Sequence, residues 1–404
     1  MSWVLLLVSP ALAGPSFIAE LGPPGPVGVD GRHARPYRGT DGAWHLGHGR
    51  SGKFHDVVLD DNLVAQSDTA RIIVEAGGDF VDHALAVCPD GSMLHAASGN
   101  LVQPDDTAWV TVLDADRVAG PTALLIDREP DMSTNDMAAL CTADLRVAAF
   151  AGSGDPDLEI PQQNWLFPIT DGVLAGAEPE RVPLHEAPRL NGTSLVWDAR
   201  AEQLLVIGMP GGSAIQVAVY DAALGPVGRT NGVVEMEPGV QAYWSSAAAQ
   251  LGDGAGYAIA HMGRSPEQGF AQDTGDVYLT ITDRSFFLTE TVRLTNLPAP
   301  DGAMRPGLAV EGDELIIAWD QDGRFHAARA RVDLDALAVA SEDRVQDTGA
   351  PSAEDTVDAD DGGGGPADPP APETGGASGC HTAPGGGGLG LLLLAPLACL
   401  GRRA

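Results

Sequence analysis

The stretch YLTITDRSFF, residues 278–287, alternates apolar and polar side chains and then breaks at an aspartate. The alternation predicts a half-buried β-strand. An aspartate directly after a strand predicts a turn, because its carboxylate accepts backbone N–H bonds. The same pattern recurs along the chain, and its aspartates are Asp60, Asp114, Asp171, Asp221, Asp283 and Asp333. We expect these residues to act in turns and not in catalysis.

The aspartates are 50 to 62 residues apart, which indicates one repeat of about 55 residues. Each repeat holds further strands. In the fourth, SLVWDARA (194–201) and LLVIGMPGG (204–212) precede the aspartate and GVVEME (232–237) follows it. A four-stranded antiparallel unit that occurs six times predicts an all-β protein, a six-bladed β-propeller.

The sixth repeat lacks a fourth strand, because the chain soon enters an acidic segment after Asp333. The N-terminal stretch SFIAELG (16–22) is an unassigned strand of the right kind. We therefore expect it to complete the sixth blade, so that the ring has no open edge. Phe17, Ile18 and Leu21 would supply its apolar contacts.

Residues 1–13, MSWVLLLVSPALA, form a short apolar run that ends in small residues, which predicts a signal peptide. A buried first strand is the alternative. The propeller is expected over 16–340. Residues 341–379 are rich in Asp, Glu, Pro and Gly and predict a disordered acidic linker. A calcium loop is the competing interpretation, but the D-x-D-x-D-G ladder with a closing glutamate is missing.

The last segment, 380–404, combines Cys380, a glycine-rich gap, the apolar run 389–400 and the pair Arg402–Arg403. This arrangement resembles the MYXO-CTERM sorting tag of exported myxobacterial proteins. The resemblance implies that Cys380 is the processing point and that a sorting protease is a partner. The alternative is a plain C-terminal membrane anchor in which Cys380 has no role. Both place the propeller outside the cytoplasm, in the cell envelope or on the cell surface, with membrane contact through this segment only.

The formal net charge is −33. Such a field repels nucleic acid and anionic lipid, so neither is expected as a partner. Solubility alone would also account for this charge.

Cys88 and Cys141 occupy matching positions in consecutive repeats. In an exported protein the two cysteines form a disulfide if the backbone brings them close enough. Two separately buried thiols are the alternative.

Function in a propeller usually lies at the mouth of the central channel, where each innermost strand begins. The candidate ligand-binding residues there are Arg32, His33, Asp82, His83, Asn135, Asp136, Tyr243, Trp244 and Arg305, with Asn191 and Thr193 in the fourth repeat. Solvated loops would have the same polar composition. Tyr243 and Trp244 would suit sugar stacking, or blade packing instead.

Asp82, His83 and Asp136 could support acid–base chemistry or a hard-metal site. However, the chain has no Asp-box, nucleophile-elbow, zinc-helix or phosphate-loop motif. His45 and His48 would face opposite sides of a strand, which argues against a shared metal. No metal site and no cofactor is therefore assigned. The sequence favours a binding or display module for a glycan, peptide or protein, and the alternative is a propeller-type hydrolase with acid–base residues at the channel mouth.

Overall fold

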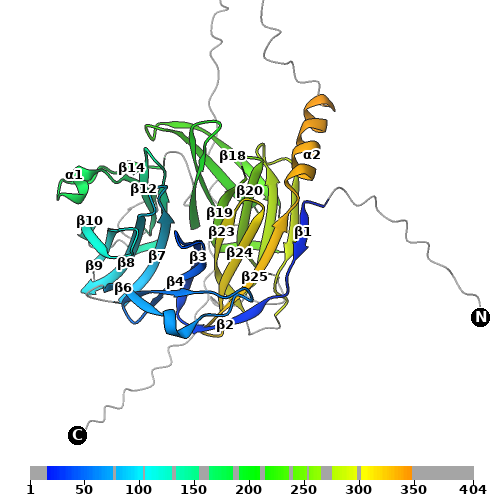
Figure 1. The fold of residues 1–404 in the computed structure, drawn as a ribbon. Coiled ribbons are helices and arrows are strands. Elements are labelled where there is room, and N and C mark those ends of the chain that lie inside the picture. The colour runs from blue at the N-terminus through cyan, green and yellow to red at the C-terminus, as the bar shows by residue number, and fades with distance from the viewer. Residues whose placement is uncertain are drawn as a thin grey trace, which may run out of the picture. The chain divides into compact units, whose positions relative to one another are not determined.

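The computed structural model describes residues 16–75, 79–102, 105–129, 133–153, 163–184, 191–209, 214–235, 240–252, 254–264, 275–297 and 302–347. These residues form six antiparallel sheets that surround a central axis (Figure 1). The expected all-β, six-bladed propeller is confirmed. In the described part of the chain, no helix is long and apolar enough to cross a membrane.

Each of the first five blades has four strands that follow chain order from the centre outward. Blade 1 consists of β3 (Arg32–Arg38), β4 (Trp44–Arg50), β5 (Lys53–Val58) and β6 (Arg71–Glu75), with a 3-10 turn at Ser67–Thr69. Blade 2 consists of β7 (Asp79–Val87), β8 (Met93–Val102), β9 (Asp105–Leu113) and β10 (Ala119–Glu129). Blade 3 consists of β11 (Ser133–Cys141), β12 (Arg146–Ser153), β13 (Gln163–Pro168) and β14 (Val182–Pro183), with helix α1 (Asp171–Leu174).

Blade 4 consists of β15 (Asn191–Asp198), β16 (Gln203–Met209), β17 (Ala214–Asp221) and β18 (Pro226–Glu235). Blade 5 consists of β19 (Gln241–Leu251), β20 (Gly256–Arg264), β21 (Asp276–Asp283) and β22 (Thr289–Arg293). Blade 6 holds β23 (Ala303–Glu311), β24 (Glu314–Gln321) and β25 (Arg324–Val332) from the end of the propeller. Its outer edge comes from the N-terminus, as β1 (Ile18–Leu21) and β2 (Gly25–Asp30).

The ring is closed by the N-terminal segment, as the sequence predicted. β1 and β2 both pair with β25, β1 at Val332 to Ala330 and β2 at Ala327 to Arg324. Phe17 is buried in the core between blades 5 and 6, whereas Leu21 is 43% exposed. The Glu290 carboxylate on blade 5 accepts the backbone N–H groups of Phe17 and Ile18. The closing strand therefore depends mainly on Phe17 and this carboxylate, and not on Leu21.

Apolar side chains fill the interfaces between neighbouring blades. The described residues form six buried clusters, one for each interface. The smallest lies between blades 1 and 2 and contains Tyr37, Phe54, Met93 and Leu113. Polar and imidazole side chains complete this interface, so its chemistry differs from that of the others.

Five of the six repeated aspartates have the expected turn role. Asp60, for example, accepts the N–H groups of Asn62 at 2.8 Å and Val64 at 2.9 Å. In four of the blades the residue three positions after the aspartate has a positive φ, in the left-handed region: Leu63, Arg117, Leu224 and Phe286. Asp333 instead accepts the N–H of Ala336 at the start of the last helix. Asp171 is the exception, because the preceding Thr170 caps helix α1.

Helix α2 (Leu334–Asp347) follows the last strand, where the sequence predicted only a brief extension to residue 340. Leu337 is fully buried and extends the core between blades 5 and 6. The sequence LDALAVASEDRVQD has no glycine or proline, so a helix continues into the acidic segment that was expected to be disordered from residue 341. The predicted segments 1–13 and 380–404, and the rest of the linker, lie outside the described residues.

Candidate functional site at the channel

Every innermost strand carries a β-bulge near its first residues, where the register slips against the second strand. Bulges re-aim side chains and are common next to functional sites. His33 in β3 and Arg305 in β23 sit at these bulges with φ of 58° and 52°. A positive φ is costly for residues other than glycine, and such strain is concentrated at binding and catalytic sites.

Asp82 is the central acceptor at this end of the channel. Its carboxylate lies 2.7 Å from Nδ1 of His33 and accepts the N–H of His83 at 2.7 Å and of Met137 at 2.8 Å. Burial alone raises the pKa of Asp82, but the His33 charge and hydrogen bond, Arg35 and the Met137 N–H together lower it to about 2. Asp82 is thus an ionised anchor for blades 1, 2 and 3.

A second carboxylate, Asp320 on β24, binds blade 6 to blade 1. It accepts the N–H of His33 at 3.1 Å, and Arg305 Nη1 lies 3.4 Å from the same oxygen. Burial raises the pKa of Asp320 above its usual range, although His33 and Arg305 oppose this. Oδ1 of Asp320 and Nε2 of His33 are both buried, and neither has a hydrogen-bond partner within the described ranges.

His83 belongs to the wall between blades 1 and 2. Its ring is fully buried, 5.1 Å from Phe54 and 5.7 Å from His95 between centroids. Burial holds the pKa of His83 well below its usual value, and it lowers that of His95 to about 3. Both rings are therefore neutral packing groups at neutral pH.

The candidate residues of the sequence thus separate into three groups. His33, Asp82 and Arg305 come together at the channel end, and Arg32 is exposed beside them. His83 is inside the wall, and Thr193 accepts a hydrogen bond from Asn164 at 3.0 Å. The side chains of Asn135, Asp136, Asn191, Tyr243 and Trp244 lie outside the described residues.

Two residues of the cluster were missed by the sequence analysis. Arg35 follows His33 by two positions and reaches Asp82, and Asp320 lies in a second strand that was treated only as structural. The first could have been found from the two-residue period of the strand. The second could not, because only the ring geometry brings β24 next to β3.

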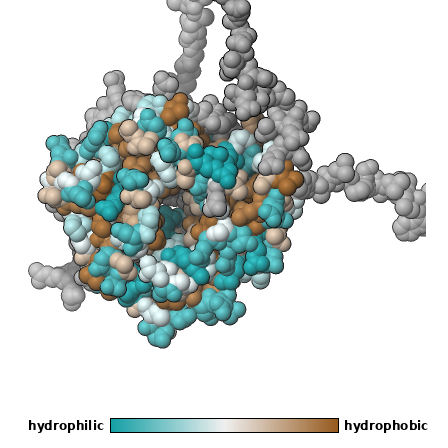
Figure 2. Space-filling model, turned by 45° about the horizontal axis from the view of Figure 1, so that its top comes forward, coloured by the Kyte–Doolittle hydropathy of each residue, from teal (hydrophilic) through white to brown (hydrophobic). Residues whose placement is uncertain are grey.

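The channel itself holds a cavity of about 90 Å³. All six innermost strands line it, through Arg35, Leu85, Ala139, Leu195, Ser246 and Leu308 among others. Figure 2 views the ring from the side of α1 and α2, and its centre is hollowed there. Typical ligand pockets are at least three times larger. The channel therefore accepts a small chemical group and not a whole sugar ring.

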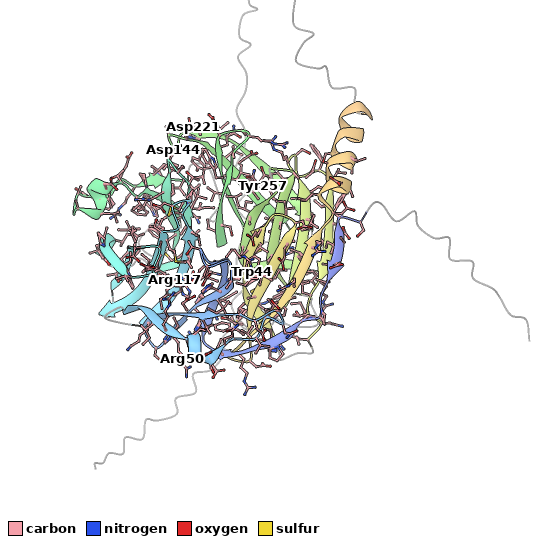
Figure 3. The ribbon with its side chains drawn as sticks, in the orientation of Figure 1. Trp44, Arg50, Arg117, Asp144, Asp221 and Tyr257 are labelled. Atoms are coloured by element: carbon pink, nitrogen blue, oxygen red, sulfur yellow. A yellow bond between two sulfur atoms is a disulfide. The ribbon has the colours of Figure 1, made fainter. Side chains whose placement is uncertain are left out.

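A buried polar network lies between blades 1 and 2. The Tyr37 hydroxyl donates to Asp56 at 2.5 Å, and His45 Nδ1 lies 3.2 Å from the same carboxylate. Arg117, labelled in Figure 3, extends from the turn of blade 2 to within 2.9 Å of His45 Nε2. Burial and the charge of Asp56 raise the pKa of Tyr37. His48 instead stacks on His55, so His45 and His48 belong to separate groups, and this network is a structural link between two blades.

Cys88 and Cys141 are joined by a disulfide with Cα atoms 4.9 Å apart. They end β7 and β11, so the bond ties blades 2 and 3 at the end of the channel opposite to Asp82. The structure thus adopts the bonded one of the two arrangements that the sequence left open. In the described part of the chain, no cluster of three or more His, Cys, Asp or Glu side chains could hold a metal ion.

No family model matches the chain, and a search of curated proteins finds no relative. Solved structures do resemble it. A protein of unknown function from Dyadobacter fermentans aligns with a TM-score of 0.56 and 12% identity over 78% of this chain and 99% of that one. Trypanosoma rangeli sialidase aligns with a TM-score of 0.50 and 10% identity over 79% of this chain and 57% of the sialidase. At these identities the likeness concerns the fold alone: the chain is a six-bladed β-propeller.

Proposed function

We propose that this protein is an exported propeller, anchored through its C-terminal segment, that binds a ligand at the channel end formed by the starts of the innermost strands. A glycan is the ligand class that we favour over a peptide or a protein. The observation that supports this is the mixture of hydrogen-bonding groups there. Arg32 and Arg305 bring positive charge, while Oδ1 of Asp320, an acceptor, and the ring nitrogen Nε2 of His33 are buried with no hydrogen-bond partner among the described residues.

A sugar hydroxyl both donates and accepts, so it matches such a mixture better than an anion or an ammonium group does. An anion placed against the unpartnered Oδ1 would be repelled by the Asp320 carboxylate, and an ammonium group there would lie beside the guanidinium of Arg305. An unsatisfied buried acceptor costs about 1–3 kcal/mol, and a ligand hydroxyl would remove that cost.

The alternative is a hydrolase of the kind predicted from Asp82, His83 and Asp136. The described geometry favours it less. Asp82 already accepts from three donors and stays ionised, and His83 is a buried neutral ring. Neither group is placed to exchange a proton with a ligand. Asp136 lies outside the described side chains and keeps the alternative open to test.

The test is a glycan array with the purified body, residues 16–347, followed by calorimetric titration of each sugar that binds. Arg305→Gln should weaken binding about tenfold or more, because a charged donor contributes about 1.5–3 kcal/mol. Arg329→Gln, on the exposed arginine paired with Glu314 at 3.1 Å, is the matched control and should change nothing. Binding that is equal in both variants would contradict the proposed site.

Hydrolysis is tested in parallel with chromogenic glycosides. Turnover that disappears in Asp136→Asn or Asp82→Asn would establish the alternative. Export and anchoring are tested by tagging both ends of the full chain. With Cys380 present, the C-terminal tag should be lost and the protein should leave the inner membrane, and Cys380→Ala should prevent both. A tag that is retained in both proteins would indicate a plain anchor.

A further inference from the structure

The channel cavity shares only Arg35 with the cluster of His33, Asp82, Arg305 and Asp320 described above, and its polar and apolar lining residues lie at different depths. The innermost strands begin at one common end, as the contacts of His33 with Asp82 and of Asp82 with Met137 require. They finish together at the opposite end, where Cys88 is bonded to Cys141. Position along a strand therefore gives depth in the channel.

The polar lining residues lie toward the strand starts, beside Met137, and the leucines of the lining lie further toward the strand ends. Arg35, Thr193 and Ser246 form the first group. Leu85, Leu195 and Leu308 follow further along their strands and form the second. Along the channel, these leucine side chains thus lie nearer the strand ends and the Arg35 guanidinium lies nearer the strand starts.

The guanidinium of Arg35 is only partly neutralised. Its Nε donates to the carbonyl oxygen of His83 at 3.0 Å. Its Nη2 lies 3.6 Å from Asp82, which is too long for a hydrogen bond. Asp82 already accepts three shorter bonds, from His33, His83 and Met137, so Arg35 acts on it through its charge and not through a hydrogen bond. Arg35 therefore retains donors on the side of the cavity, where its side chain is 16% exposed.

We infer that this cavity is a binding site for a small aliphatic carboxylate. The carboxylate pairs with the Arg35 guanidinium, the geometry in which arginine binds anions most strongly. The alkyl part contacts the leucine side chains. A cavity of about 90 Å³ holds roughly three water molecules, which corresponds to a carboxylate with a few carbon atoms. The site lies within the channel, and its inference does not rest on the proposed glycan binding.

The experiment titrates the body, residues 16–347, with acetate, propionate, butyrate and hexanoate at constant ionic strength, by calorimetry and by NMR line broadening of the ligand. Butyramide, which has the same shape without the charge, is the control ligand. Affinity should rise about fourfold per methylene from acetate until the alkyl part exceeds the cavity. Butyrate should bind at least tenfold more tightly than butyramide.

Two variants locate the site. Arg35→Gln should lower butyrate affinity about tenfold or more, and Arg329→Gln should leave it unchanged. Because Arg35→Gln also removes a bond to the His83 carbonyl, Ala139→Leu serves as a second variant that fills the cavity without touching Arg35. It should abolish binding with an unchanged circular dichroism spectrum. Equal affinities for butyrate and butyramide, no binding at millimolar concentration, or full binding in Ala139→Leu would each overturn the inference.

Discussion

Phe17 anchors the N-terminal end of the segment that closes the ring. Phe17, just before β1, is 4% exposed and packs in the core with Val332 and Leu337, whereas Leu21 at the end of β1 is 43% exposed. Replacing a buried phenylalanine by alanine costs about 3–5 kcal/mol, because the transfer free energy is lost and a cavity remains. The same change at an exposed leucine costs about 0.5 kcal/mol. The two substitutions therefore separate packing from strand propensity.

In a domain of this size each kcal/mol shifts the melting temperature by about 2 °C. Phe17→Ala should therefore lower it by roughly 6–10 °C, and Leu21→Ala by about 1 °C. Differential scanning calorimetry of the body, residues 16–347, measures both. Deleting residues 16–22 should have a larger effect, since it also exposes the edge of β25 to pairing with other chains, visible as aggregates in size-exclusion chromatography. Equal melting temperatures for Phe17→Ala and Leu21→Ala would refute the proposed role of Phe17.

Three further predictions concern the rest of the ring. Burial lowers the pKa of His48 to about 4, of His95 to about 3 and of His261 to about 4. These imidazole rings are therefore uncharged in the folded protein at neutral pH. In the unfolded chain the same histidines take up a proton near pH 6.5. Each of them should therefore lower the free energy of unfolding by about 2 kcal/mol between pH 7 and pH 5, measured as a fall in the urea midpoint. An unchanged midpoint would show that the rings are charged in the fold. Cys88→Ser with Cys141→Ser opens a loop closed over 53 residues and should cost about 4 kcal/mol, so an unchanged guanidinium midpoint would argue against the bond. A chain that ends after residue 347 should have the same melting temperature as the full-length protein. A lower melting temperature would show that the segment beyond α2 packs against the propeller.

The blade repeat was predictable because its signal is local. An apolar strand followed by an aspartate turn is encoded within ten residues, and six copies fix the number of blades. The closure of the ring by the N-terminal segment was predictable from the number of strands in each repeat, because the sixth repeat lacked one. Asp171 shows the limit of this reasoning, because a neighbouring threonine took over its capping role at no cost to the fold.

The residues of the candidate site were predictable only in part. His33, Asp82 and Arg305 lie at strand starts, where the repeat alone places them near the channel. Asp320 and the wall position of His83 depend on how neighbouring blades pack, which the sequence pattern does not encode. The extent of α2 was missed because an acidic composition was taken to exclude a helix, although the residues there are good helix formers.

The position of β25 has a mechanical consequence. This strand lies inside its blade, with β24 on one side and β1 and β2 on the other. The chain continues from it through α2 toward the proposed anchor. A pull on that tether first unwinds the helix and then loads a strand that is hydrogen-bonded along both edges, so many backbone bonds share the force. β1 and β2 lie outside the path from β25 to this tether, so the strands that close the ring are not the ones that are pulled.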